Sequence, residues 1–143
     1  MPATGRSLPR RVFLFASALP AFSGTKEDVL DVFAVIAAAL SDGSGARAIS
    51  SFDKAIPEYS RLREYLYVLA EGWQTSCSIE VVEFEEAQGV ARLKLRWLLR
   101  ISAAGGTGRM TDREQDVSAK VERRGKAWKI TAFDPVEFFR PPR

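Results

Sequence analysis

The sequence predicts an α+β domain in which three helices are followed by four long antiparallel strands, with the helices gathered on one face of a curved sheet. Between residues 25 and 73, apolar side chains recur at steps of three and four, the period of an amphipathic helix. From residue 74 onward they recur at every second position, the period of a strand with one buried face. Helices therefore come first in the chain and strands second.

The clearest pattern is a hairpin over residues 90–121. From residue 91 to 101 the odd positions are apolar and the even positions are mostly basic, so this strand has one buried and one solvated face. Glycines at 105, 106 and 108 allow the chain to reverse, because glycine reaches positive φ freely. Val117, Ala119 and Val121 continue the buried face on the return strand. The outer face carries a basic row of Arg92, Lys94, Arg96 and Arg100, which indicates either phosphate binding or a solvated ion ladder. The ladder is favoured, because Glu114 and Asp116 lie on the facing strand.

Start and stop signals divide the preceding segment into three helices, from Thr25 to Gly43, from Ser44 to Phe52 and from Pro57 to Gly72. Thr25 and Asp28 have the spacing of a capping box at the start of the first helix. Residues 29–40 contain a single polar side chain, which predicts a helix that is buried on nearly all sides.

The strands around the hairpin follow from the same alternation. A change of phase predicts a β-bulge near residues 81–82. Tight turns are predicted at residues 88–89 and 124–126, and the Asp-Pro pair at residues 134–135 ends the last strand. The phenylalanines at 138–139 then form a closing apolar plug.

Residues 1–24 have the pattern of an export signal, and residues 25–143 are predicted to form one mature domain. A basic start precedes a run of about eight apolar residues, which is too short for a membrane span of roughly 20 residues. Arg10 and Arg11, followed by Val12-Phe13-Leu14, resemble a twin-arginine signal. We therefore expect export to the periplasm or the medium, with cleavage between Ala18 and Gly24.

Composition narrows the function classes. The 143 residues are 46% hydrophobic and 27% charged, which is typical of a globular domain. The net charge of +3 comes from the predicted signal, since the remainder has 18 basic and 18 acidic residues, and no nucleic-acid partner is expected. Histidine is absent and Cys77 is the one cysteine. These absences exclude an internal disulfide, Ser-His-Asp and Cys-His catalysis and most zinc sites, and we expect no metal and no cofactor.

The order of elements, together with residues 49–53, the strand 126–130 and the ending 134–139, resembles the nuclear transport factor 2-like superfamily over residues 25–140. This superfamily includes SnoaL-like polyketide cyclases and ketosteroid isomerases. The resemblance implies a cone-shaped fold with an internal cavity. Its dehydratase-like branch relies on histidines, which this chain lacks. No residue matches the carboxylate base and oxyanion donor of the isomerase-like branch.

The candidate ligand-binding residues are those whose predicted faces direct a polar or aromatic side chain towards such a cavity, namely Asp53, Tyr59, Tyr65, Trp97, Arg113 and Gln115. A buried arginine must be paired or face a cavity, so Arg113 either binds a ligand carboxylate at the cavity mouth or lies in solvent beyond the core. Asp53 is either a general base at the rim or the partner of a nearby cation. The aromatic residues either line a pocket or belong to the core.

Two function classes remain open. The first is an exported protein that binds a small apolar or amphipathic molecule in the cone. The second is a cyclase, isomerase or dehydratase-type enzyme that uses a carboxylate and a tyrosine, with its catalytic residues unknown. The first is favoured because no acid lies unambiguously within the apolar periodicity. A third class is an interaction domain that uses the outer sheet face. That face is charged, which predicts a monomer or a weak, salt-sensitive homodimer, because ion pairs seldom offset their desolvation at an interface.

Overall fold

The computed structural model describes residues 20–103 and 108–142, and the side chains from residue 24 onward within the first range. Its elements are α3 (Pro20–Asp42), α4 (Gly45–Ile49), α5 (Tyr59–Gly72), β1 (Trp73–Ala87), β2 (Val90–Ala103), β3 (Met110–Arg124), β4 (Ala127–Asp134) and the 3-10 helix η1 (Val136–Phe139). Three helices followed by four antiparallel strands confirm the predicted α+β fold. The greater part of the predicted export signal, residues 1–19, lies outside the described residues.

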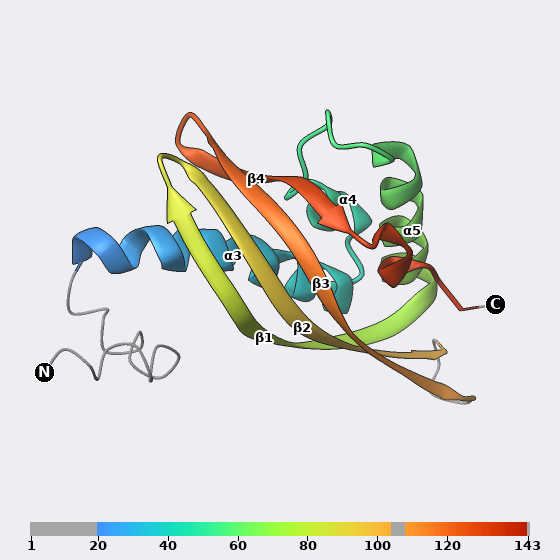
Figure 1. Cartoon of the computed structure of the whole chain (residues 1–143). Coiled ribbons are helices and arrows are strands. Elements are labelled where there is room, and N and C mark those ends of the chain that lie inside the picture. Colours follow the sequence, from blue (N-terminus) through green and yellow to red (C-terminus); the bar gives the residue numbers. More distant parts are fainter. Residues whose placement is uncertain (1–19, 104–107, 143) are drawn as a thin grey trace, which may run out of the picture.

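The four strands form one open antiparallel sheet in the order β1-β2-β3-β4, so that each strand pairs with its neighbour in sequence. Burial alternates along β2 as predicted, with every odd residue from 91 to 101 buried. A register shift between Val81 and Glu83 confirms the predicted bulge in β1. Figure 1 shows that the sheet is strongly twisted, with α3 and α4 behind it and α5 at one end.

The first helix differs from its prediction at its start and in its burial. It begins at Pro20 and not at Thr25, because proline suits the first position of a helix, where no intrahelical N–H bond is needed. It is buried on one side only, and Val35 on the opposite side is 39% exposed. Its end is as predicted: Gly43 has φ +82°, and the amides of Gly43 and Ser44 donate to the carbonyls of Leu40 and Ala39.

The other two helices are shorter than the sequence predicts. Ser44 caps α4 by accepting a hydrogen bond from the Arg47 amide at 3.1 Å, but the helix ends at Ile49. The chain then extends, and Phe52 forms a parallel bridge with Ile130 of β4. Helix α5 ends at Gly72, as predicted, and β1 follows without a loop.

A single hydrophobic core fills the space between the helices and the inner face of the sheet. The predicted plug is part of it, since Phe138 and Phe139 of η1 are both buried. Burial of whole aromatic side chains is among the largest favourable contributions to folding that single residues make. Within the ranges that the structure covers, no helix is long and apolar enough to cross a membrane.

Candidate ligand-binding site

The centre of the core is a cluster of aromatic rings around Trp97. The Trp97 side chain has no exposed surface. Its ring centroid lies 5.4–6.3 Å from those of four phenylalanines, Phe33, Phe133, Phe138 and Phe139. These are the separations of edge-to-face and tilted ring pairs in well-packed interiors. The structure therefore places Trp97 among core residues, at the position where the resemblance implies a cavity.

Two other predicted residues meet at the end of the sheet. Asp53 and Tyr59 line a pocket of about 480 Å³, here called the rim pocket, together with Ile49, Ser50, Phe52, Lys54, Arg124 and Lys129. Its walls come from the end of α4, the loop that follows it, the start of α5, and strands β3 and β4. The bridge between Phe52 and Ile130 holds these elements together, because the Asp53 amide donates to the Ile130 carbonyl at 2.8 Å.

Asp53 is fully engaged by groups of the protein. Its carboxylate accepts hydrogen bonds from the Ala55 amide at 2.8 Å and from Nε of Arg124 at 2.9 Å. The hydrogen bond from Ala55 and then the contact with Arg124 lower the pKa of Asp53 below its ordinary value. An acid with a lowered pKa is a weak general base near neutral pH. Asp53 therefore fits the pairing role that the sequence left open.

The rim pocket combines an apolar floor with a positive edge. Ile49 and Phe52 are buried, and Tyr59 is half-buried against the core. Lys129 donates to the Ser50 carbonyl at 2.6 Å, which fixes its ammonium group at the edge. Lys54 makes no ion pair among the described residues. With Arg124, the pocket holds three cations and the single acid Asp53.

Tyr65 and Arg113 lie elsewhere, and each forms a hydrogen bond with a residue of η1. The Tyr65 hydroxyl donates to the Glu137 carboxylate, 3.1 Å away. Desolvation, and then the contact with Glu137, raise the pKa of Tyr65. Nη1 of Arg113 donates to the Phe138 carbonyl, and partial burial lowers the pKa of Arg113. Both side chains thus hold the C-terminal plug.

Gln115, the last predicted residue, is exposed although it stands opposite Trp97 in the register of β2 and β3. The six predicted residues are therefore divided among four places: the rim pocket, the plug, the core and the solvent. Their assignment to a ligand stays a prediction.

The sequence prediction missed the three cations of the rim pocket, namely Lys54, Arg124 and Lys129. Lys54 directly follows Asp53 in the sequence, and its position beside a predicted site residue could have identified it. The other two come from the end of β3 and from β4, far along the chain. The bridge between Phe52 and Ile130 brings β4 to the loop that holds Asp53, and no local pattern encodes that bridge. In the portion of the chain that the structure describes, no group of three or more potential metal ligands gathers.

Comparisons with known proteins identify folds and not activities. No protein-family model and no curated protein matches the sequence. A conserved protein from Planctomyces limnophilus has a similar structure, with TM-score 0.68 at 9% identity over 77% of this chain and 93% of that one. A nuclear transport factor 2-like superfamily protein from Salmonella enterica has TM-score 0.60 at 11% identity, covering 79% and 90%. A ketosteroid isomerase-like protein from Erwinia carotovora has TM-score 0.58 at 11% identity, covering 75% and 91%.

Proposed function

We propose that this chain, which has the nuclear transport factor 2-like fold, binds a small amphipathic molecule with an anionic group in the rim pocket. One observation carries the proposal: an apolar floor of Ile49 and Phe52 lies beside three cations and a single acid that is already paired. The apolar part of a ligand would contact the floor and Tyr59. Its anionic group would face Lys54 and Lys129. Pockets with an apolar lining and a few convergent polar groups are typical small-molecule sites.

An enzymatic function of the cyclase, isomerase or dehydratase type is the alternative. The ketosteroid isomerase-like neighbour has this fold, and the contact between Tyr65 and Glu137 supplies a tyrosine beside a carboxylate. Two features favour binding over catalysis. Arg61 and Arg140 both pair with Glu137, at 3.1 and 3.4 Å, and the Glu137 side chain is 46% exposed and not enclosed in a cavity.

Titration with octanoate, followed by amide chemical shifts, tests the proposed pocket. Octanoate should shift the signals of residues 49–54 and 129 saturably, and octanol should shift them less, because it lacks the charge. The double change Lys54→Gln and Lys129→Gln should weaken octanoate binding about tenfold, the loss expected of charge-assisted contacts. Lys126→Gln is the control, because Lys126 is exposed in the turn before β4 and lies outside the rim pocket. Equal weakening by the control, or shifts confined to other regions, would refute the pocket.

Native mass spectrometry distinguishes a binding protein from an enzyme. Protein purified from its own host should carry a retained anionic molecule that is recovered unchanged after prolonged incubation. Recovery of a chemically altered molecule, with the alteration lost in Glu137→Gln and Tyr65→Phe, would favour the enzymatic alternative.

We also propose that the protein is exported and that it works outside the cytoplasm. The support is the sequence of residues 1–24, with its paired arginines and short apolar run. Replacing Arg10 and Arg11 together by lysine should strongly impair export while leaving the mature sequence unchanged. Cell fractionation measures this outcome, and normal export of the double variant would exclude the twin-arginine route.

A further inference from the structure

The outer face of the sheet carries an ion ladder with one gap. Three basic residues of β2 have an acidic partner on a neighbouring strand. Arg96 pairs with Asp116 at 3.0 Å, Arg100 with Asp112 at 2.9 Å, and Lys94 with Glu83 at 3.9 Å. Arg92 is the fourth member of the row, and it makes no ion pair with any residue that the structure describes. Asp116 is therefore a partner in the ladder as predicted, but Asp112 and Glu83 take the place of Glu114, which stands opposite Leu98, and the ladder is interrupted at Arg92.

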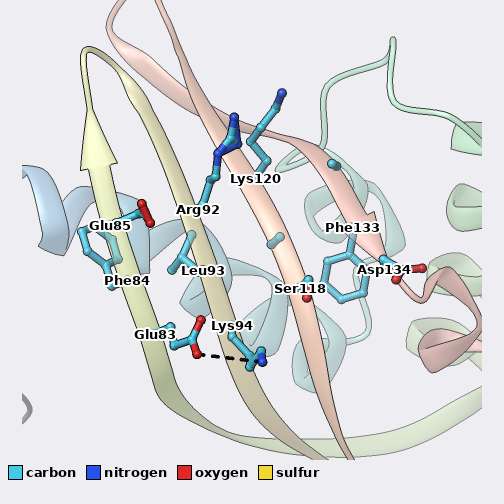
Figure 2. A pocket seen from close by; sticks show the side chains of 12 residues that line it. Glu83, Phe84, Glu85, Arg92, Leu93, Lys94, Ser118, Lys120, Phe133 and Asp134 are labelled. Atoms are coloured by element: carbon cyan, nitrogen blue, oxygen red, sulfur yellow. Dashed lines mark ion pairs between the residues drawn. The ribbon is translucent and has the colours of Figure 1, made fainter.

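A second cation stands beside the unpaired one. In the register of β2 and β3, Arg92 lies directly opposite Lys120. Like charges at directly opposed positions of a sheet are destabilising. Lys120 has one acidic partner, Glu122 on its own strand at 3.3 Å. Figure 2 shows the charged ends of Arg92 and Lys120 reaching in the same direction, away from the pair formed by Lys94 and Glu83.

These two cations border a groove of about 690 Å³, here called the outer groove. Its other outward-facing residues are Glu83, Glu85, Lys94, Ser118, Ala132 and Asp134. The groove is also bordered by three residues whose side chains are buried on the inner face of the sheet, namely Leu93, Ala119 and Phe133. Ser118 and Ala132 are small, which leaves free space next to Lys120. The volume lies within the roughly 300–1,000 Å³ of small-molecule sites.

We propose that the outer groove binds a small molecule bearing a phosphate-like dianion, with its charged group between Arg92 and Lys120. The planar guanidinium of Arg92 presents parallel N–H donors that match the geometry of an oxyanion, and Lys120 adds a second positive charge. A dianion would therefore offset the repulsion between the opposed Arg92 and Lys120, of which only Lys120 has an ion-pair partner, Glu122, among the described residues. The acids Glu83, Glu85 and Asp134 surround the groove and oppose an extended polyanion, so the ligand is compact.

The test follows amide chemical shifts in the full chain at constant ionic strength. Inorganic phosphate should shift the signals of residues 92 and 120 saturably, and acetate, with one charge, should bind at least tenfold more weakly. Arg92→Gln should weaken phosphate binding at least tenfold. Arg96→Gln is the matched control, because Arg96 lies on the same strand and the same face as Arg92. Its charge is already neutralised by Asp116, so its loss should leave phosphate binding unchanged. Glu85→Gln should tighten binding, because Glu85 stands opposite Arg92 on β1.

Two further probes identify the source of the dianion. Tighter binding of phenyl phosphate than of inorganic phosphate would support a soluble organic ligand in the groove. Sedimentation with vesicles containing phosphatidic acid, lost in Arg92→Gln and kept in Arg96→Gln, would support the same site with a lipid headgroup as its ligand. Equal losses in the two variants, or shifts that follow ionic strength alone, would overturn the proposal. The rim pocket shares no residue with the outer groove, so this proposal can fail while the proposed ligand site in the rim pocket stands, and the reverse.

Discussion

At the scale of a single residue, the free energy of unfolding depends on which face of β2 a side chain occupies. Leu95 and Trp97 have no exposed surface, whereas the Arg96 side chain between them is about half exposed. Removal of a buried side chain costs its transfer free energy and leaves a cavity. An exposed ion pair contributes little, because water solvates both charges well.

Leu95→Ala and Trp97→Ala should each lower the free energy of unfolding by about 2–5 kcal/mol. Arg96→Ala, on the same strand, should lower it by less than about 1 kcal/mol. Denaturant midpoints measure the three variants against the parent chain. The reverse ranking would mean that the buried and solvated faces of the sheet had been exchanged.

The single cysteine allows a test of burial by reactivity. Burial raises the pKa of the Cys77 thiol to about 11, and the neighbouring indole N–H of Trp97 opposes this shift only in part. Since the thiolate is the reactive form, alkylation by iodoacetamide at pH 8 should be about a hundredfold slower in the folded protein than in the unfolded chain. The thiol also ionises more readily when unfolded, so the free energy of unfolding should fall as the pH rises from about 9 towards 11. Equal alkylation rates in native buffer and in guanidinium would contradict this assignment.

At the scale of elements, η1 is a short closing piece that the sheet and a helix hold in place. Its phenylalanines contact Trp97 from within the core. From outside the core, Arg113 of β3 donates to the Phe138 carbonyl, and Tyr65 of α5 donates to Glu137. A four-residue 3-10 helix has few hydrogen bonds of its own, so these outer contacts decide how long it stays in place.

Arg113→Met should release η1 without emptying the core, because methionine keeps the apolar stem and removes the donor. The Phe138 carbonyl would lose its partner, at a cost of about 1–3 kcal/mol. Hydrogen exchange should therefore accelerate at the amides of residues 138 and 140, and exchange in β2 should change much less. Unchanged protection of these two amides would show that the plug does not depend on Arg113.

Elements with a strong local signal could be predicted from the sequence, and those that depend on distant pairing could not. The bulge near Val81 and the end of α3 at Gly43 follow from phase and from glycine conformation. The start of α3 at Pro20 was missed because the capping-box spacing at Thr25 competes with a proline signal five residues earlier. The shortness of α4 was missed because Phe52 leaves the helix to pair with Ile130.

In the candidate site, too, single residues could be predicted from local sequence, whereas their neighbours from distant parts of the chain could not. Asp53 and Tyr59 were predicted separately, and the structure brings them into one pocket. Their cationic neighbours Arg124 and Lys129 depend on the docking of the helical half onto β4, which no short-range pattern records. The predicted inward face was also wrong in the first half of β3, where Gln115 stands opposite the buried Trp97 but is exposed to solvent.

At the scale of the whole molecule, the charge of the outer face governs association. The ladder places charged side chains from β1, β2 and β3 across the centre of this face. A stable dimer formed through it would have to desolvate these groups, and interface cores are depleted in charge. We expect the mature domain to be a monomer, or at most a weak dimer that salt weakens further.

Light scattering at micromolar concentration, in low and in high salt, measures the molecular mass and so tests this expectation. The mass should correspond to one chain in high salt. A dimer that persists unchanged in both conditions would contradict it and would indicate a more apolar interface elsewhere. Substitution of Val35, an exposed apolar residue on the outer side of α3, by aspartate would then test that helix as the contact.

The pairing of each strand with its sequence neighbour also sets the order in which parts of the chain fold. The turns at Gln88–Gly89 and at Gly125 close short loops, and a hairpin forms in about 1–10 μs. The bridge between Phe52 and Ile130 closes a much longer loop, and such contacts form later. We infer that the transition state for folding contains the sheet before the rim pocket is complete. A ligand of that pocket would therefore slow unfolding and leave the folding rate unchanged.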